Sequence, residues 1–279
     1  MGKVWVDGSL ADEANARVSP FDHGLLVGDG VFETLRVYDG KPFAFRRHVE
    51  RLAHSAAGLG LAVPDPDVVR DAANAVLHAN GLSEGRLRIT LTGGPSPLGS
   101  ERGTTTPTLI VAAAPSRRWP PAEAVVTVPW TRNERGATAG LKTISYAENV
   151  RALAYAHERD ATEAIFLNTR GELCEATGSN VFVVNDGIVR TPPADAGCLL
   201  GVTRALVLDL CASLGVNAKE VALGGDSLSS ADEAFLTSST REVQPISRVD
   251  GHAIPAAPGR VTVELAAAFR DLVARDPDP

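Results

Sequence analysis

A proline-rich stretch divides the chain and limits how it can fold. Residues 114–122 hold Pro115, Pro120 and Pro121. Proline fixes the backbone and removes a hydrogen-bond donor, so this stretch favours an extended connection over a helix or an inner strand. We therefore predict a linker at residues 116–121, a small N-terminal domain at 1–115 and a larger C-terminal domain at 122–279. The 279 residues, of which 44% are hydrophobic, suffice for a core in each domain.

The N-terminal part combines strand and helix patterns in an α+β order. Residues 31–38 alternate as a strand does and end at the hairpin signal Asp39-Gly40. Apolar residues then recur at helical spacing, and a Gly/Pro/Ser-rich loop follows at residues 93–103. The predicted elements are strands at 4–6, 31–38, 86–91 and 108–113 and helices at 47–59 and 67–78.

The C-terminal part has a similar mixture, so the fold class is predicted as α+β or α/β in two domains. After Lys142, a helical pattern places Tyr146, Val150, Leu153 and Ala154 on one face. The remaining elements are predicted strands at 125–128, 164–167, 181–184, 188–189 and 234–236, a helix opening at 201–203 and a last helix through 261–272.

Composition argues against several classes of function. The formal net charge is −7 and no lysine- or arginine-rich run occurs, which disfavours a nucleic-acid partner. No stretch reaches the roughly 18 apolar residues of a membrane helix, and the N-terminus lacks the apolar segment of a signal peptide. Cys174, Cys198 and Cys211 lack metal-ligand spacing, and so do the histidines, so no metal is expected. Three cysteines without a signal peptide are typical of reduced thiols, which predicts a cytoplasmic protein.

Lysine is scarce, and this narrows the search for a covalent cofactor site. Only Lys3, Lys41, Lys142 and Lys219 occur, and arginine cannot form a Schiff base because its guanidinium stays protonated. Lys3 lies beside the N-terminus, Lys41 follows a turn glycine, and Lys219 lies in a polar run. The side chains of these three lysines are expected to be solvated. Lys142 instead follows small residues at 136–140, which let a ligand approach closely. We predict that Lys142 carries an aldehyde cofactor as a Schiff base.

Other residues could complete such a site, although each has a simpler explanation when taken alone. Glu175 precedes the small-residue loop 176–180, and a carboxylate beside a pyridinium keeps that ring nitrogen protonated. Thr203 opens a helix whose backbone N–H groups would attract an anion, but a threonine cap explains it equally well. Residues 237–240 and Arg51 could add to a phosphate cradle, or be a polar loop and a surface arginine.

Six sequence blocks, taken together and in order, resemble those of a known family. The family is that of the fold-type-IV pyridoxal-phosphate enzymes, which includes branched-chain aminotransferases, D-amino-acid aminotransferases and 4-amino-4-deoxychorismate lyases. The resemblance runs over nearly the whole chain, and several blocks in order are more specific than any one. The blocks are Gly28-Asp-Gly-Val-Phe-Glu-Thr34, His48-Val-Glu-Arg51-Leu52, Leu141-Lys142-Thr143, Glu175-Ala-Thr-Gly-Ser-Asn180, Leu200-Gly-Val-Thr-Arg204 and Thr237-Ser-Ser-Thr240.

The resemblance implies a role for each matched residue. Lys142 corresponds to the Schiff-base lysine that also moves protons, and Glu175 to the partner of the pyridine nitrogen. Tyr146 is similar to a tyrosine that hydrogen-bonds the ring oxygen of the cofactor. The family also implies a homodimer that acts on a small-molecule amine, with pyridoxal 5'-phosphate between the two domains. The implied phosphate cradle consists of Arg51, Val202, Thr203, Ser238 and Ser239, with Thr240 close by.

The reaction is less constrained than the cofactor. D-amino-acid aminotransferases carry an Arg-x-His pair where this chain has Leu98-Gly99-Ser100, so that activity is not expected. Branched-chain enzymes typically have Phe-Glu-Gly where this chain has Phe32-Glu33-Thr34. Ser19-Pro-Phe-Asp-His-Gly24 and residues 237–245 look more like the lyases, in which a threonine at the position of Thr34 is thought to assist the chemistry. The helix after Lys142 matches the lyases only partly.

These points predict a 4-amino-4-deoxychorismate lyase, which releases pyruvate and forms 4-aminobenzoate for folate synthesis. The alternative is a transaminase of the branched-chain type, which transfers an amino group to a 2-oxo acid. Phe32 and Thr240 are expected to contact the substrate, and Arg132 or Arg135 to hold its carboxylate, unless both are exposed arginines. A non-catalytic cofactor carrier is a third alternative, disfavoured by the full set of site residues.

Overall fold

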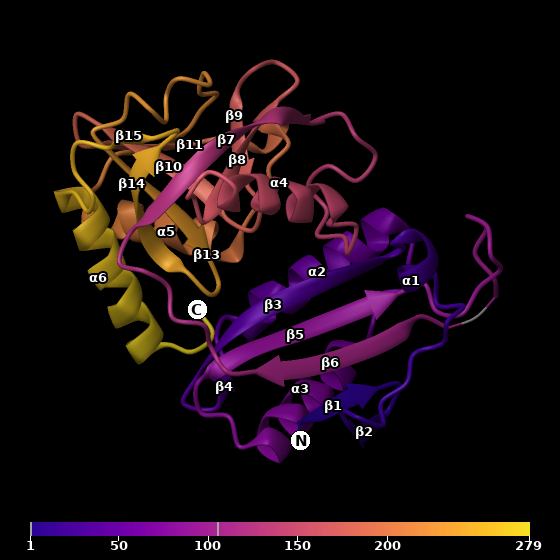
Figure 1. Cartoon of the computed structure of the whole chain (residues 1–279). Helices are drawn as coiled ribbons and strands as arrows, with labels where there is room; N and C mark the ends of the chain where they lie inside the picture. Colours follow the sequence, from indigo (N-terminus) through magenta and orange to yellow (C-terminus); the bar gives the residue numbers. More distant parts are fainter. Residues whose placement is uncertain (1, 105) are drawn as a thin grey trace. The chain divides into compact units, whose positions relative to one another are not determined.

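The computed structural model describes residues 2–104 and 106–279 and contains two compact units, each with its own sheet (Figure 1). One unit comprises Met1–Arg117, Leu141–Tyr146 and Pro277–Pro279, and the other comprises Arg118–Gly140 and Ala147–Asp276. Below they are called the N-terminal and the C-terminal unit. The predicted class, a two-domain fold of mixed helices and strands, is confirmed.

The division differs from the predicted one at the segment that holds Lys142. We predicted that residues 122–279 form one domain, whereas Leu141–Tyr146 belongs to the N-terminal unit. The cause is backbone pairing. The N–H of Phe32 donates to the carbonyl of Lys142 at 3.0 Å, and the N–H of Ile144 donates to the carbonyl of Gly30 at 2.9 Å. An open strand edge offers unpaired backbone groups, and here this edge binds the lysine segment.

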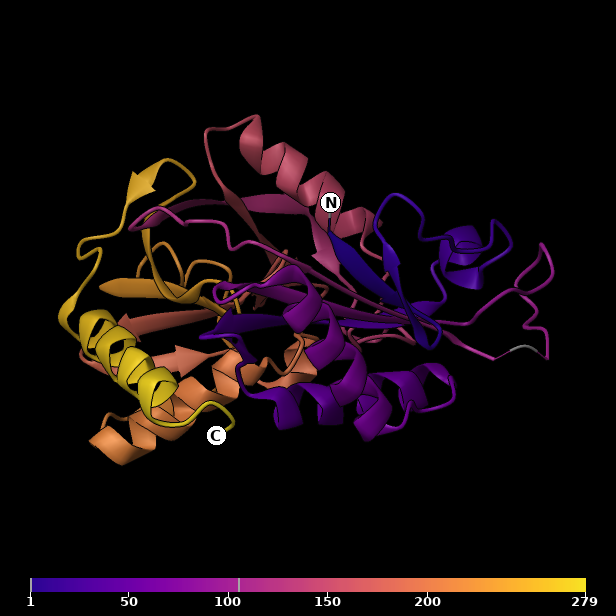
Figure 2. The same ribbon diagram turned by 90° about the horizontal axis from the view of Figure 1, so that it is seen from below.

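The sheet of the N-terminal unit is antiparallel, and two helices cover one of its faces. Leu52 and Ala72, one from each helix, pack into a single apolar core with Leu35 and Ile89 of the sheet. Figure 2 shows both helices, in purple, on the same side of this sheet. The strand order is β2 (Ser9–Asp12), β1 (Lys3–Val6), β6 (Thr108–Ala114), β5 (Gly85–Thr92), β3 (Gly30–Tyr38) and β4 (Lys41–Pro42), and the helices are α2 (Phe45–Leu59) and α3 (Pro66–Asn80).

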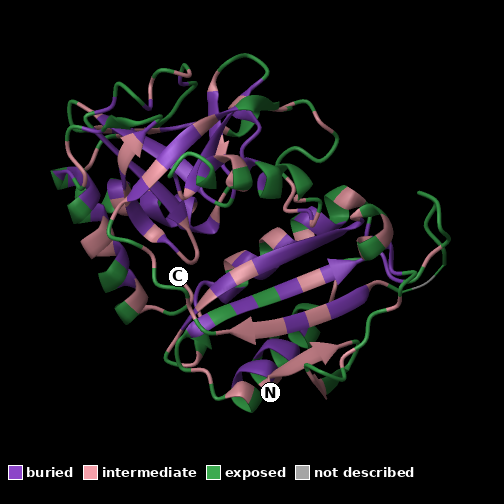
Figure 3. Ribbon diagram, viewed as in Figure 1, coloured by how far each residue is buried: buried purple, intermediate pink, exposed green. Residues whose placement is uncertain are grey.

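Alternation along the central strands decides which side chains face the helices. On β5, buried Leu87 and Ile89 alternate with exposed Arg86 and Arg88, as the colours of Figure 3 show. On β3, the same rule places Val31, Glu33, Leu35 and Val37 in one inward row, and all four are completely buried. A charged residue therefore lies within the apolar face of the sheet.

The helices of this unit begin and end where the sequence supplies caps. The side chain of Asp65 accepts the N–H of Asp67 at the start of α3, and Gly81 ends that helix with a positive φ. A short helix, α1 (His23–Val27), lies before β3, where we predicted neither a helix nor a strand. Five residues are too few to produce a periodic pattern, so α1 could not be recognised from apolar spacing.

An ionic cluster around the buried residues His23 and Asp29 fastens part of the loop between β5 and β6. Asp29 receives two hydrogen bonds from Arg102, at 2.7 and 2.6 Å, and Arg102 also donates to the carbonyl of Gly60. The ring of His23 has its Nδ1 3.0 Å from Asp29 and its Nε2 2.9 Å from the carbonyl of Gly99. Both neighbours are hydrogen-bond acceptors, so both contacts are satisfied only when the imidazole carries two protons.

This cluster predicts that stability falls as pH rises through neutrality. The hydrogen bond to Asp29 and that to Gly99 raise the pKa of His23 above its ordinary value of 6.5, although burial and Arg102 oppose the shift. The resulting stabilisation is complete below pH 6.5 and is lost as pH rises through the higher folded-state pKa. We expect the denaturation midpoint to decline over this window in the wild type and much less in His23→Gln. Equal declines in both proteins would contradict the assignment.

The C-terminal unit is built on a mixed sheet of nine strands. Its inner strand β10 is buried along nearly its whole length, and Phe182 on β10 stacks on Phe235 of β13 at 4.8 Å. The path is β12 (Ala218–Glu220), β11 (Ile188–Thr191), β10 (Asn180–Asn185), β13 (Glu233–Ser238), β14 (Glu242–Val249), β7 (Glu123–Arg132), β8 (Glu163–Asn168) and β9 (Leu173–Ala176), with β15 (His252–Ala253) on β14; the helices are α4 (Ala147–His157), η1 (Ala194–Ala196), α5 (Val202–Leu214) and α6 (Arg260–Arg275).

The apolar face predicted for α4 is wrong. Val150 is 67% exposed, and the buried residues of this helix are Asn149, Ala152 and Ala156. Asn149 is buried because its amide group bonds to the carbonyl of Thr177, and the alanines pack with Phe166 of β8. A polar contact therefore rotates the helix away from the face that apolar spacing suggested. Among the described residues, no helix is both long and apolar enough to cross a membrane.

Candidate active site

The predicted site residues fall into two sets, one in each unit. The N-terminal set surrounds the β3 edge and α2, and the C-terminal set surrounds the ends of β9, β10 and β13. The first set comprises Phe32, Thr34, Arg51, Lys142 and Tyr146, and the second comprises Arg132, Glu175, Val202, Thr203, Ser238, Ser239 and Thr240.

Backbone contacts on both sides hold Lys142 in place. Its N–H donates to Oγ of Ser55 on α2 at 3.1 Å, and its carbonyl accepts from Phe32 on β3. The side-chain Nζ lies 4.4 Å from the ring centroid of Phe32 and 3.4 Å from the hydroxyl of Tyr146. The two rings meet edge to face at 5.0 Å. The structure therefore brings together Lys142, Phe32 and Tyr146, three of the predicted residues.

Arg88 belongs to the same group, although we did not predict it. Its guanidinium carbon lies 3.8 Å from the ring centroid of Phe32, so Arg88 and Lys142 contact the same ring. Arg88 also pairs directly with Thr34 in the β3–β5 register, which places both side chains on the face that bears Phe32. The signal that could have identified Arg88 is its outward position in the alternation of β5, opposite the residues of the Phe32-Glu33-Thr34 block.

Arg51 has a different environment from the predicted one. A surface arginine was the simpler explanation offered for it, but its side chain is only 13% exposed. Its Nε and Nη2 donate to the carboxylate of Glu33 at 2.8 and 2.7 Å. Nδ1 of His48 lies 2.6 Å from the same carboxylate. Glu33 and His48 were not predicted. Glu33 interrupts an apolar inward row of β3, whereas a lone histidine in one sequence does not indicate a partner.

In the C-terminal unit, Glu175 is held at the end of β9. Its Oε2 accepts the N–H of Leu199 at 2.9 Å, and its Oε1 lies 3.5 Å from Nε of Arg132. Arg132 also lies 3.3 Å from Glu148 and stacks on the ring of Phe166 at 4.2 Å. The carboxylate thus has a fixed orientation and a neighbouring positive charge. Two acids already surround Arg132, which makes it a weaker candidate for a substrate carboxylate than predicted.

The turn that leads into α5 depends on Asn180 and Gly201. The amide of Asn180 donates to the carbonyl of Leu199 at 2.7 Å. A Cβ atom at Gly201 would lie 2.1 Å from the side-chain oxygen of Asn180, so only glycine fits there. Glu175 and Asn180 therefore both fix the residues before α5. This helix begins at Val202 with no side-chain cap on its first N–H groups.

The loops of this set contain polar groups suited to a ligand. Among the described residues, the buried hydroxyls of Ser179 and Thr237 have no hydrogen-bond partner. Ser238 accepts the N–H of Arg241 at 3.2 Å, which shapes the loop that holds Ser239 and Thr240. Buried hydroxyls are normally satisfied, so their presence beside the uncapped start of α5 fits an anionic, oxygen-rich ligand.

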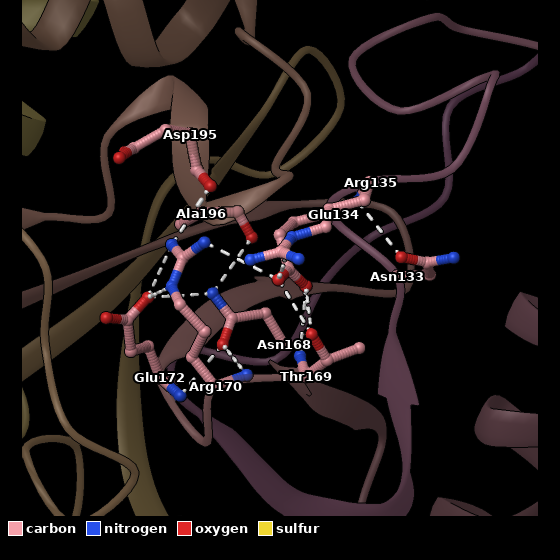
Figure 4. Close-up of polar contacts among 9 residues, drawn as sticks. All are labelled: Asn133, Glu134, Arg135, Asn168, Thr169, Arg170, Glu172, Asp195 and Ala196. Carbon is pink, nitrogen blue, oxygen red and sulfur yellow. Dashed lines mark hydrogen bonds and ion pairs between the residues drawn. The ribbon is translucent and has the colours of Figure 1, made fainter.

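The loop that follows β7 in the C-terminal unit is fixed by Glu134 (Figure 4). Its carboxylate accepts both the N–H and the hydroxyl of Thr169 on the turn before β9, and these hydrogen bonds lower the pKa of Glu134 to about 2. Arg170 in the same turn donates to the carbonyl of Asp195 at 3.0 Å. Neighbouring Arg135 has a side chain that is 82% exposed. Arg135 was expected either to hold the substrate carboxylate or to be an exposed surface arginine. Its exposed position agrees with the second of these expectations.

Within the described residues, no group of three His, Cys, Asp or Glu side chains could hold a metal ion. The chemistry of the two residue sets is instead that of a lysine, an oriented carboxylate, hydroxyls and guanidinium groups. Such a set suits an organic cofactor with an aldehyde, a ring nitrogen and a phosphate. The residues present therefore fit pyridoxal 5'-phosphate.

Comparisons with known proteins agree with this conclusion. Residues 30–249 match the model of the family described as Amino-transferase class IV. A D-alanine aminotransferase from Bacillus licheniformis is 32% identical over 276 residues, which cover 97% of each chain. The structure of a branched-chain aminotransferase from Thermoproteus uzoniensis superimposes with a TM-score of 0.91 at 31% identity and covers 98% of this chain and 94% of that one.

A third similar protein bears on the reaction. A Legionella pneumophila structure, described provisionally as a 4-amino-4-deoxychorismate lyase, has a TM-score of 0.88 at 26% identity and covers 93% of this chain and 97% of that one. Class IV aminotransferases use pyridoxal 5'-phosphate, so membership of this family confirms the predicted cofactor. This chain therefore belongs to the class IV aminotransferase family and is a fold-type-IV enzyme that depends on pyridoxal phosphate.

Proposed function

We propose that the enzyme is an amino-acid transaminase of the branched-chain type. The observation that carries this proposal is the position of Arg88, whose guanidinium shares the ring of Phe32 with Lys142. An arginine in that position can bind the carboxylate of an amino acid or a 2-oxo acid while the lysine acts on the adjacent carbon. The branched-chain aminotransferase of Thermoproteus uzoniensis supports this reading, and it reverses our ranking of the two reactions.

Each residue set has a distinct part in the proposed reaction. The bound cofactor supplies an electron sink for the carbon that loses its proton. Lys142 moves that proton, with the hydroxyl of Tyr146 at 3.4 Å to orient its amine. Glu175 keeps the ring nitrogen protonated, while Arg51, Val202, Thr203, Ser238 and Ser239 bind the phosphate. Phe32 and Thr240 contact the substrate.

Thr34 supports the lyase as a second candidate. It faces the same side of the sheet as Phe32 and lies opposite Arg88 in the strand register. A hydroxyl there could assist the departure of pyruvate from 4-amino-4-deoxychorismate. The similarity to the Legionella structure agrees with this candidate, at a lower identity than the aminotransferase relatives show.

One experiment separates the two reactions. Purified enzyme is offered 4-amino-4-deoxychorismate alone and, separately, branched-chain amino acids with 2-oxoglutarate. Transfer of the amino group to 2-oxoglutarate without release of 4-aminobenzoate is the expected result. Release of 4-aminobenzoate in the absence of an amino acceptor would establish the lyase and overturn the proposal.

Replacement of Arg88 tests the carboxylate assignment. We expect Arg88→Met to lower kcat/KM by about 10–100-fold, mainly through KM, because a charge-assisted hydrogen bond of about 1.5–3 kcal/mol is lost. Arg86→Met is the matched control, because Arg86 is an exposed arginine two residues away on the same strand. An unchanged KM in Arg88→Met would assign the substrate carboxylate to another residue.

Three exposed apolar side chains on neighbouring segments support the predicted homodimer. Phe21, Leu25 and Leu98 are 52%, 71% and 73% exposed. The segments that carry them are paired, since the N–H of Ser96 donates to the carbonyl of Phe21 at 3.0 Å. Large contiguous apolar surfaces commonly mark protein contacts, and a second copy of this chain is the proposed partner. Sedimentation analysis of the wild type and of Leu25→Glu tests whether this surface holds two copies together.

The cytoplasmic location of the protein stays a prediction.

A further inference from the structure

We propose that Glu33 is a positioning residue that orients Arg51 and thereby sets the affinity of the enzyme for the phosphate group of its cofactor. The inference rests on the proposed role of Arg51 in phosphate binding. It assigns a task to a buried acid that the reaction itself does not use.

The location of Glu33 is unusual for a charged residue. It lies in the inward row of β3 between Val31 and Leu35 and has no exposed surface. An isolated carboxylate in such surroundings would be strongly disfavoured, so it must be compensated by its contacts. A residue of this kind in an otherwise apolar row points to a specific task for the carboxylate.

The contacts of Glu33 define the orientation of Arg51. The Nε–Nη2 edge of the guanidinium donates to both carboxylate oxygens at 2.8 and 2.7 Å, a two-point contact that fixes the plane of the group. The His48 ring, which donates from Nδ1 at 2.6 Å, holds the carboxylate from another side. Arg51 and His48 are three residues apart on α2, so one helix supplies both donors.

The protonation states agree with this arrangement. Burial alone would raise the pKa of Glu33, but the charge and hydrogen bonds of Arg51, together with His48, lower it to about 2. Burial lowers the pKa of His48, and the charges of Arg51 and Lys142 act in the same direction. The cluster thus contains one carboxylate, one guanidinium and a neutral imidazole that donates its single N–H. Its net charge is zero.

Because the cluster of Glu33, Arg51 and His48 has no net charge, the effect of the charge of Glu33 on phosphate affinity can be separated from its effect on the orientation of Arg51. If charge alone decided phosphate affinity, removal of the Glu33 charge would strengthen binding, because Arg51 would be uncompensated. If orientation decides it, any change that moves the carboxylate weakens binding, even when the charge is kept. A flexible arginine must lose its freedom when it binds, whereas one already held by Glu33 does not.

Two variants distinguish charge from orientation. Glu33→Asp keeps the charge but shortens the side chain, and Glu33→Gln keeps the length but removes the charge. The cofactor is removed from each protein, and the affinities for pyridoxal 5'-phosphate and for pyridoxal are measured by absorbance titration. The ratio of these affinities isolates the contribution of the phosphate from the rest of the ligand.

We expect the ratio to fall about 10-fold or more in both variants, the size of effect seen when a supporting contact of a ligand-binding group is lost. A general structural defect would weaken both ligands equally and leave the ratio unchanged, which would overturn the proposal. A higher ratio in Glu33→Gln, or an unchanged ratio in Glu33→Asp, would also overturn it. Glu84→Gln, which removes an acid paired with Arg36 at 2.8 Å on the exposed surface, is the matched control.

Arg51 must be tested beside Glu33. In Arg51→Met the ratio should fall, and adding Glu33→Met to that variant should cause no further fall, because Glu33 acts through Arg51. This double variant has neither buried charge, so it remains testable if a single Glu33 variant fails to fold. An unchanged ratio in Arg51→Met would refute the phosphate role of Arg51 itself, which is a different result from failure of the Glu33 variants alone.

Discussion

Replacement of Lys142 with alanine is expected to abolish transamination, with a loss of at least about 10²–10⁴-fold, the usual contribution of a positioned acid–base group. The variant also loses the covalent attachment of the cofactor. Visible absorbance of the bound cofactor and single-turnover transfer measure the two effects separately. The denaturation midpoint of Lys142→Ala should differ little from that of the wild type, because the backbone contacts of residue 142 remain.

The other lysines provide the control. Lys41 and Lys219 are exposed, and the side chain of Lys3 is 41% exposed in a pair with Asp12. Lys219→Ala should keep wild-type activity and absorbance. If Lys142→Ala kept the absorbance of the lysine-bound cofactor, another amine would have to be the attachment point and the site would be wrongly placed.

Replacement of Arg51 with alanine is expected to destabilise the cofactor-free protein by about 3–5 kcal/mol, because it leaves the buried carboxylate of Glu33 without its main counter-charge. The deficit should shrink as pH falls, since burial then raises the pKa of Glu33 and the acid becomes neutral. Urea denaturation of the cofactor-free protein at several pH values measures both effects.

Two further variants complete this test. Arg36→Ala removes an arginine from a pair in which Glu84 is 52% exposed, and it should cost no more than about 1 kcal/mol. The double variant Glu33→Met/Arg51→Met should recover most of the stability lost in Arg51→Ala, because no buried charge is left unpaired. A double variant as unstable as the single one would show that packing, not charge, stabilises this region.

Local patterns were sufficient to predict the main helices and nine of the strands, but β2, β4, β9, β12, β14 and β15 were not predicted. The strand at 31–38 and the helices at 47–59 and 67–78 each have a clear period and suitable ends, and the structure contains them as β3, α2 and α3. On α4 a polar contact caused the apolar face to be misread: Asn149 is buried and Val150 is exposed. Hydrogen bonds of single side chains leave no trace in apolar spacing.

The candidate site could be predicted only where a residue type is rare or a block is recognisable. Lysine scarcity was enough to select Lys142. By contrast, Arg88 and His48 are members of common classes, and only the strand register and the α2 contacts reveal their partners. Glu33 did leave a signal, since it interrupts the inward row Val31, Leu35 and Val37. An acid at an inward strand position could have been recognised as a candidate.

The backbone pairing of the lysine segment has a consequence for sequence variation. The lysine segment pairs with β3 through main-chain groups of Phe32, Gly30 and Ile144, and such pairing does not depend on which side chains Phe32 and Ile144 carry. Mutations at neighbouring side chains that are not buried can therefore accumulate without displacing the reactive amine. The enzyme can in this way explore new substrates through nearby residues while its chemistry stays in register.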